Sequence, residues 1–486
     1  MNRINQFVYI FIVTFFLCGC NDFLEEKPIS EIPSENMWKT ARDAKAGVND
    51  IYGQLRNTLR ENYFYWGEFR SDNVLPGAPV MADQARVISN LMSTDERCAK
   101  WTNLYQMINQ ANLAIKYIPG IDMPNVSDRN DYLGQAYALR ALGYFYAVRV
   151  WGDAPLFVEP VETWSNDIYK SRTNKNMIIE NVIIPDLKKA EKLMNRNGNF
   201  ERKRISICGV WAILADVYMW IGDYNNADQT IDKMKTITYN NAPFVSLTPT
   251  LQSWHTMFTE ELNNKLSDDT PNNDEYSTKE LIFVIHFNMD EVGTNGYSYM
   301  YQWFSGSGNR AAVLSDKFMN IFNDKDMQGD LRKDFVSKYY QNGYELRKYM
   351  AGDISNSLNK TCEVAYPIYR YSDMLLLQAE AKTHLGKWDE ALDIVKKIRD
   401  RAGLNTPTAN EFNSEEELVK YILRERQVEL VGEGRRWFDL RRTNMWKEVM
   451  GPINGMQQDG NELFPIHYSH IIENPKITQN PYYGNH

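Results

Sequence analysis

The stretches "LADVYMWIGDYNNADQTIDKMK" (214–235) and "QAEAKTHLGKWDEALDIVKKIR" (378–399) superpose without a gap, and they decide the fold. Each has helically spaced apolar residues, a central glycine and an aromatic residue two positions after it. Small residues let two helices approach, and glycine permits the turn between them. The matched pairs include Ala215 with Ala379, Gly222 with Gly386, Tyr224 with Trp388 and Ala227 with Ala391. This pattern predicts two helix-turn-helix units of the tetratricopeptide type.

Helical patterning also dominates outside the two repeats. Residues 101–118 place Leu104, Ile108, Ala111 and Ile115 on one stripe. Residues 132–151 continue helically until the glycine and proline of 152–155. The chain is therefore predicted to be mainly α-helical, with a repeat scaffold that insertions interrupt.

The segment of about 240–360 has a different composition. It is rich in Asn, Asp, Gly and Thr, and residues 280–287 ("ELIFVIHF") predict a strand within it. Long irregular insertions on a rigid scaffold often carry binding sites. We expect a loop-rich insertion with a few short strands.

The N-terminus carries an export signal. The apolar run Phe7–Leu17 follows a head with one charge and is too short to span a bilayer, which takes about 20 apolar residues. The stretch "LCGC" (17–20) resembles a bacterial lipobox, which implies that residues 1–19 are removed and Cys20 is lipidated. The alternative is a cleaved signal with an ordinary cysteine nearby. We expect the protein to be anchored to the membrane by the acyl chains on Cys20 alone.

The rest of the chain divides into a tether and one domain. Residues 20–36 are acidic and interrupted by proline, and residues 37–486 have the composition of a single globular domain. The net charge is −9, and removing residues 1–19 takes away Arg3 alone, leaving −10. This acidity argues against nucleic acid and against an electrostatic hold on anionic lipid. The remaining cysteines are odd in number and widely spaced, so no disulfide framework is expected.

An arginine-rich stretch lies near the C-terminus, in residues 414–442. Ser414 and Glu417 have the spacing of a capping box, and Glu425 and Glu429 share the apolar stripe of the following helix. Buried carboxylates need partners. The predicted internal ion-pair lock comprises Glu425, Glu429, Glu433 and Asp439 with Arg435, Arg436, Arg441 and Arg442. An anion-binding site is the alternative interpretation.

Several motifs, in order, now point to one family. They are "DFLE" after Cys20, "RSDN" (70–73), "GQAYALRALGYFYAVRVWGDAPL" (134–156), "YRYSDMLLLQAEA" (369–381), "IRDRAG" (398–403), "ERQVELVGEGRRWFDLRR" (425–442) and "NPKITQNPYY" (474–483). The chain resembles the SusD/RagB family of Bacteroidetes outer-membrane lipoproteins over nearly its whole length. Gln427 and Ser372 are small departures from the family pattern.

The resemblance implies a non-enzymatic binding protein without catalytic residues or cofactor. SusD-like proteins sit as a lid on a SusC-like TonB-dependent barrel and deliver oligosaccharides to it. The implied location is the outer membrane, lipid-anchored and facing the exterior. The alternative is RagB-type capture of peptides. The hallmark motifs transfer fold and partner, but they do not transfer ligand specificity.

The sharpest candidate ligand site is an aromatic run in residues 294–309. Tyr297, Tyr299, Tyr301 and Trp303 alternate with other residues, so in an extended strand all four rings would face one way. Flat rings suit the apolar faces of sugars. The alternative is an edge strand that buries its aromatic residues in the core.

A second candidate region follows the "RSDN" motif, between residues 71 and 100. The resemblance places part of the glycan site there. Its candidates are Asp72 and Asn73, for which capping or turn roles are the stronger interpretation, and Arg86, for which a solvated surface role is. Trp66, in a stretch that otherwise predicts core packing, is a further candidate.

Other classes of function find little support in the sequence. A glycoside hydrolase needs two carboxylates at a set separation, and no pair is singled out apart from those assigned to arginines. No G-x-S-x-G elbow is present. His467 and His470 have a helical spacing but lie in an irregular stretch, so no metal site is predicted. Calcium in an acidic loop such as 267–269 is compatible with the sequence, but nothing predicts it.

Overall fold

The computed structural model confirms a mainly helical protein. It describes residues 37–78, 80–163, 168–196, 201–239, 242–258, 279–288, 298–304, 310–340, 342–350 and 364–484. The predicted signal peptide, Cys20 and the tether therefore lie outside the described residues. Within these ranges no helix is long and apolar enough to cross a membrane.

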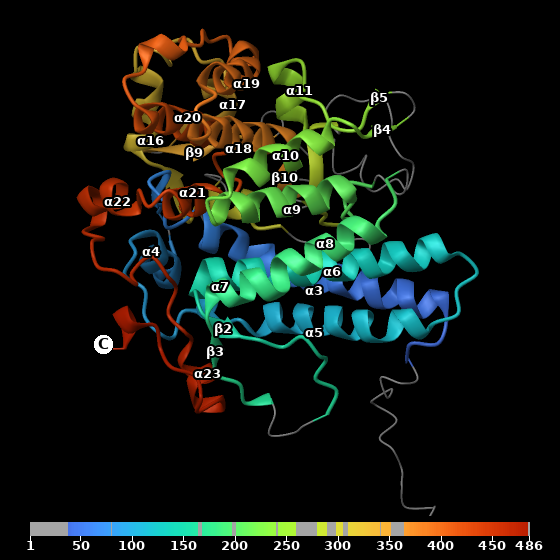
Figure 1. Ribbon diagram of the computed structural model, residues 1–486. Helices are drawn as coiled ribbons and strands as arrows, with labels where there is room; N and C mark the ends of the chain where they lie inside the picture. The colour runs from blue at the N-terminus through green and yellow to red at the C-terminus, as the bar shows by residue number, and fades with distance from the viewer. Residues whose placement is uncertain are drawn as a thin grey trace, which may run out of the picture.

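Nine helices in this part of the chain form a stack in which each helix packs on at least one other. In Figure 1 the stack rises from α5 through α6, α8, α9 and α10 to α18. The helices are α3 (Ala41–Gly67), α5 (Thr102–Tyr117), α6 (Val126–Trp151), α8 (Ile184–Leu193), α9 (Ile207–Trp220), α10 (Tyr224–Met234), α18 (Tyr371–His384), α19 (Trp388–Arg401) and α20 (Glu415–Glu429). The small and apolar side chains of these helices form the core, because close packing between the helices removes them from water.

Shorter helices and strands connect or flank this stack. The short helices are α4 (Ala82–Ile88), α7 (Lys175–Ile178), α11 (Leu251–Thr256), α15 (Met300–Phe304), α16 (Asp316–Asn320), α17 (Lys333–Val336), α21 (Arg436–Arg442), α22 (Trp446–Asn454) and α23 (Tyr468–Glu473). Two-stranded sheets pair β2 (Ala154–Pro155) with β3 (Arg172–Thr173) and β4 (Thr238–Tyr239) with β5 (Ala242–Pro243).

The two repeats predicted from the sequence are the pairs α9–α10 and α18–α19. Gly222 and Gly386 make their turns with φ of +76° and +73°. The pairs are more than 130 residues apart in the sequence, yet α10 packs directly on α18. Tyr224, which follows the first turn, stacks on His384 at 4.0 Å between ring centroids. The insertion therefore loops out of a continuous stack.

We expect Gly386→Ala to destabilise the protein by about 1 kcal/mol, because an L side chain is strained at this positive φ. An added Cβ would meet no atom within 4 Å, so the cost comes from the backbone alone. Urea denaturation measures it. Gly120→Ala is the matched control, since its Cβ also meets open space and its φ is not positive. Equal midpoints for the two variants would contradict this account.

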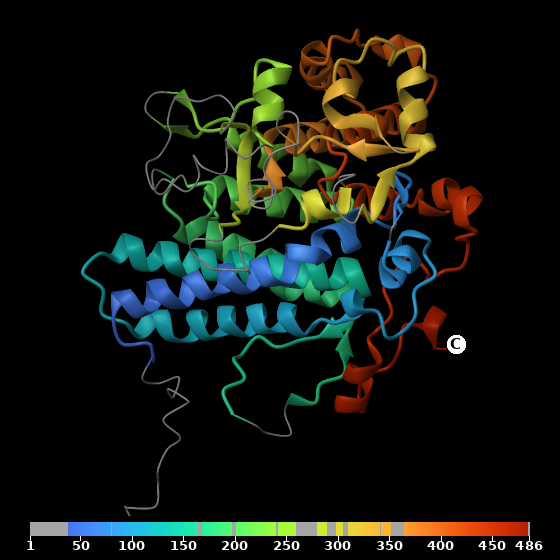
Figure 2. The same ribbon diagram turned by 180° about the vertical axis from the view of Figure 1, so that it is seen from behind.

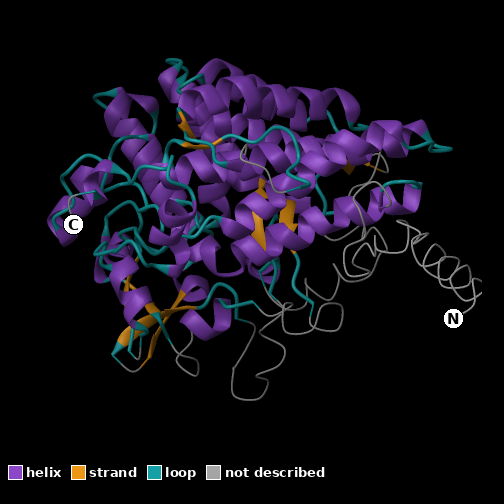
Figure 3. Cartoon of the chain, turned by 90° about the horizontal axis from the view of Figure 1, so that it is seen from below, coloured by secondary structure: helices purple, strands orange, loops and turns teal. Residues whose placement is uncertain are grey.

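The insertion contains the few short strands that the sequence predicted. The predicted strand at 280–287 is β6 (Leu281–Ile285), and it pairs antiparallel with β10 (Tyr366–Arg370). A four-stranded sheet has the order β1 (Val74–Pro76), β7 (Ala312–Leu314), β9 (Gly343–Leu346), β8 (Ser337–Tyr340). Figure 2 shows its insertion strands beside the C-terminal helices, and Figure 3 shows the sheet at one corner of the molecule. Strand β1 brings the 71–100 region to the insertion.

Glu425 and Glu429 lie buried on α20, but their partners are not the ones predicted. Arg332 and Arg399 pair with Glu425 at 2.7 and 2.9 Å between N and O atoms. Three guanidinium groups lie 2.6–3.0 Å from the Glu429 carboxylate, those of Arg332, Arg370 and Arg401. The predicted pairing of these two glutamates with the arginines of 435–442 is therefore wrong.

Those four arginines bind mainly groups on other elements, and Arg442 alone also pairs with a predicted partner, Asp439 on its own helix α21. Their partners are Asp216 and Asp373 for Arg435, Asp72 for Arg436, the Arg149 carbonyl for Arg441, and Glu380 and Asp439 for Arg442. Glu433 pairs instead with Arg370 and Lys348. The reason is the turn between α20 and α21, where Gly432 and Gly434 have positive φ and redirect the chain toward α9 and α18.

Candidate functional site

The predicted aromatic face at 297–303 has a different geometry from the one expected. Residues 300–304 form the helix α15, so alternate rings cannot share one side. Trp303 is 1% exposed and packs against the core rings of Phe64, Tyr65 and Phe69. The prediction of an extended strand is wrong here, and Trp303 offers no surface to a ligand.

Of the remaining tyrosines of this run, the structure describes the side chain of Tyr299. Tyr297 and the side chain of Tyr301 lie outside the described residues. Tyr299 is half-buried and stacks on Trp303 with ring centroids 4.9 Å apart. The Arg60 guanidinium also lies over the Tyr299 ring, at 5.4 Å from its centroid. Protein neighbours therefore cover much of this ring.

Trp66 and Asp72 serve the fold. Trp66 is 1% exposed, and its indole N–H donates to the main-chain carbonyl of Cys98 at 2.8 Å. Asp72 is buried and accepts two hydrogen bonds from Arg436 at 2.8 and 3.1 Å. Burial raises the pKa of Asp72, but Arg436 outweighs burial and the net pKa is lowered. Trp66 therefore offers no surface to a ligand, whereas Asp72 lines a small pocket of about 210 Å³ with its carboxylate held by Arg436.

Asn73 is buried too, whereas Arg86 reaches the surface. The Asn73 amide donates to Glu68 at 2.8 Å and accepts from Gln427 at 2.8 Å. Arg86 is 40% exposed and forms a bidentate pair with buried Glu96 at 2.5 and 3.0 Å. The structure brings the 71–100 and 298–340 regions together, but most of the predicted ligand side chains there hold the fold.

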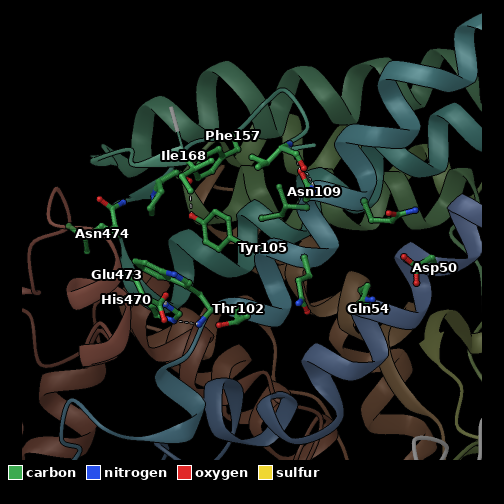
Figure 4. A pocket seen from close by; sticks show the side chains of 17 residues that line it. Asp50, Gln54, Thr102, Tyr105, Asn109, Phe157, Ile168, His470, Glu473 and Asn474 are labelled. Atoms are coloured by element: carbon green, nitrogen blue, oxygen red, sulfur yellow. Dashed lines mark hydrogen bonds and ion pairs between the residues drawn. The ribbon is translucent and has the colours of Figure 1, made fainter. Parts of the chain in front are cut away.

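The described residues form a ring-lined groove elsewhere, along α5 (Figure 4). It encloses about 760 Å³, which is within the usual range for ligand sites. Buried Trp101 and half-buried Tyr105 and Phe157 are its aromatic lining residues. The other lining residues are Asp50, Gln54, Thr102, Gln106, Ile108, Asn109, Gln110, Pro155, Val161, Ile168, His470, Glu473, Asn474 and Ile477.

One wall of the groove is the segment 153–161, which side chains of α5 and α6 fasten in place. The Tyr105 hydroxyl donates to the Pro155 carbonyl at 2.6 Å. Asn109 exchanges two hydrogen bonds with the main chain of Val161, at 2.7 and 3.1 Å. The Tyr144 hydroxyl bonds both the N–H and the carbonyl of Phe157, at 2.7 and 2.8 Å. The main chain of Phe157 is therefore already fixed before a ligand binds, which lowers the entropy cost of binding.

A buried chain of polar groups supports the same wall from behind. The Asn112 amide donates to the carbonyls of Phe157 and Glu159 at 3.0 and 3.2 Å. Arg140 donates to the Asn112 oxygen at 2.8 Å and pairs bidentately with Asp186 at 2.7 and 2.9 Å. Such a satisfied network makes the wall rigid.

His470 lies at the α23 end of the groove, away from Asp50, and its imidazole is neutral (Figure 4). Its ring stacks on Trp101 with centroids 4.9 Å apart, and its Nε2 accepts the Trp101 main-chain N–H at 3.2 Å. Burial lowers the pKa of His470 to about 4, and His467 and Lys100 add to the shift. An acceptor at Nε2 places the proton on Nδ1. His470 thus presents an N–H donor beside Glu473, whose carboxylate lies 3.7 Å away.

Acid is expected to destabilise the protein through His470. The unfolded imidazole binds a proton near pH 6.5 and the folded one only near pH 4, so the unfolded state gains protons first as pH falls. The free energy of unfolding should lose about 2–3 kcal/mol from this group between those values. His470→Gln keeps an acceptor for the Trp101 N–H and should flatten the dependence. Urea titrations from pH 7 to 4 measure it, and parallel slopes would contradict the assignment.

The sequence contained part of the signal for this groove. Trp101, Tyr105 and Asn109 recur every four residues, which places two rings and an amide on one helical face. The apolar stripe of residues 101–118, on which the sequence prediction rests, does not include this face. The other walls come from α3, from residues 155–161 and 168, and from residues 470–477, which no spacing rule connects to α5.

The described residues combine a helical-repeat scaffold with a groove of rings and amides, an arrangement typical of the class of proteins that bind small ligands. Comparison with known families agrees with this class. Residues 221–483 match the SusD family, and residues 22–219 match a family described as starch-binding and associating with the outer membrane. The chain belongs to the SusD family.

Individual relatives extend over almost the entire chain. The SusD-like protein P38 of Formosa agariphila is 33% identical over 96% of each chain. Among solved structures, B. fragilis NanU has a TM-score of 0.74 at 22% identity, covering 94% of this chain and 99% of that one. A laminarin-binding SusD-like protein has a TM-score of 0.71 at 19% identity, over 91% and 100%. These two structures support the fold.

Proposed function

We propose that this protein is a cell-surface lipoprotein, anchored through Cys20, that captures oligosaccharides and delivers them to a SusC-like TonB-dependent transporter. The observation that carries the proposal is the groove along α5. Half-buried rings match the apolar faces of pyranoses, and side-chain amides match their hydroxyl rims. Family membership and the laminarin-binding neighbour support saccharide as the ligand class. No chemical step is assigned to the protein.

Binding is tested with the full-length lipoprotein in mild detergent. Calorimetry against a panel of starch, laminarin and mannan oligosaccharides should give saturable binding for at least one of them. A panel of short peptides of mixed sequence should give none. Binding of peptides alone would replace saccharide capture with peptide capture.

Peptide capture has one structural observation in its favour. Strand β8 is the terminal strand of the four-stranded sheet, and Tyr339 on it is 61% exposed. An extended peptide can add to such a strand through main-chain hydrogen bonds. If peptides bind, Tyr339→Ala should weaken them while leaving saccharide binding unchanged.

Delivery requires a complex with the transporter. Affinity purification of the lipoprotein from its own outer membranes, in mild detergent, should bring down a barrel protein in fixed proportion. Replacing Cys20 with Ser should release the chain from the membrane fraction. Repeated recovery of the lipoprotein alone would contradict delivery without affecting saccharide capture.

A further inference from the structure

The charged side chains that line the groove are all acidic. Of its 17 lining residues, Asp50 at the α3 end and Glu473 at the α23 end carry formal charge. Figure 4 shows them at opposite ends, with Tyr105 and Asn109 between. None of the lining residues is Lys or Arg. The polar side chains between the two carboxylates carry neutral amides, the hydroxyls of Thr102 and Tyr105, and the neutral imidazole of His470.

Two of the nearby ammonium groups, those of Lys170 and Lys116, have partners of their own. Lys170 donates to the Leu156 carbonyl at 3.1 Å, and its ammonium lies over the Phe157 ring, 4.7 Å from the ring centroid. Lys116 pairs with Glu162 at 2.5 Å. Lys100 contributes to the lowered pKa of His470 but does not line the groove. Within the described residues, the groove surface is thus neutral in its middle and negative at both ends.

We propose that the groove selects uncharged saccharides over those that carry sulfate or uronic-acid groups. This inference rests on the proposed capture of saccharides. A sulfate or carboxylate entering the groove would give up water for amides alone and would approach Asp50 or Glu473. An uncharged pyranose loses little free energy when it enters the groove, since hydrogen bonds to the amides and to His470 replace those to water. Selectivity therefore comes from a penalty on the wrong ligand.

The test uses matched pairs of probes and the full-length lipoprotein in mild detergent. Each pair consists of a starch-derived or laminarin-derived oligosaccharide and its sulfated derivative of the same length. Calorimetry at low salt should show the neutral member binding about tenfold or more tightly. Glu473→Lys should reduce this ratio to about threefold or less, because it supplies a cation at the mouth. Raising the salt concentration should also reduce the ratio in the unmodified protein.

Asp393→Lys is the matched control, since it makes the same change in net charge at an exposed position on α19. Its ratio should equal that of the unmodified protein. Equal or tighter binding of the sulfated members, or equal ratios for Glu473→Lys and Asp393→Lys, would overturn charge selection while leaving capture intact. Failure of every saccharide to bind would overturn capture, and this inference with it.

Discussion

Gln106→Trp is expected to weaken saccharide binding by about 30- to 100-fold. Gln106 is exposed on α5 and lines the groove, so an indole at this position fills the space that the ligand needs. Losing contacts with two rings and several amides corresponds to about 2–3 kcal/mol of binding free energy. Because the position is exposed on a helix, the stability of the fold should change little.

The matched control is Gln229→Trp, which makes the same substitution at an exposed position on α10. Calorimetry with the saccharide that binds most tightly should return the unmodified affinity for this variant. Equal affinities for the two tryptophan variants would remove the groove as the binding site. If Tyr339→Ala weakened binding instead, the site would move to the sheet around β8.

The second large effect is expected from the buried charge network. Arg370 is fully buried and lies 2.7–2.8 Å from the carboxylates of Glu280, Glu429 and Glu433. Arg370→Met fills a similar volume but leaves these acids short of a cation. Removing one partner from a buried ion pair costs about 3–5 kcal/mol. The urea midpoint should fall accordingly, and part of the loss should return at low pH, where the acids can protonate.

An exposed pair provides the comparison for this network. Lys396 and Asp400 lie 2.7 Å apart on α19, and both side chains are more than half exposed. Lys396→Met should change the free energy of unfolding by about 0.5 kcal/mol or less. If Arg370→Met cost as little, the buried network would not hold the insertion to α20. Glu429→Gln is a milder second variant that keeps the shape of the cluster.

The network explains why the acidic stripe of α20 is tolerated. Burial raises the pKa of Glu429, but Arg401, Arg370 and Arg332 together outweigh burial and hold it well below its usual range. The three arginines lie on different segments. Arg332 is in the insertion, Arg370 is on β10 and Arg401 is on α19. The charges therefore join segments that are distant in the sequence. The motif at 425–442 supplies the acid Glu429, and the other segments supply the arginines.

The predictions that succeeded concern local patterns. The repeats at 214–235 and 378–399, the strand at 280–287 and the helix end at Trp151 follow from spacing and turn chemistry within about 20 residues. Gly152, with φ of +76°, ends α6 where the sequence indicated. The aromatic run failed because alternation over seven residues is compatible with helix as well as strand, and contacts with Phe64 and Phe69 favoured the helix.

The amino-acid sequence alone determined the helical repeats, their turns and the family, because each depends on residues that are close along the chain. It also showed that Glu425 and Glu429 would share the apolar face of a helix. Only the tertiary structure decided which cations face those acids, which rings remain exposed and where a groove opens. Those outcomes depend on contacts between segments tens to hundreds of residues apart, and no local spacing encodes such contacts.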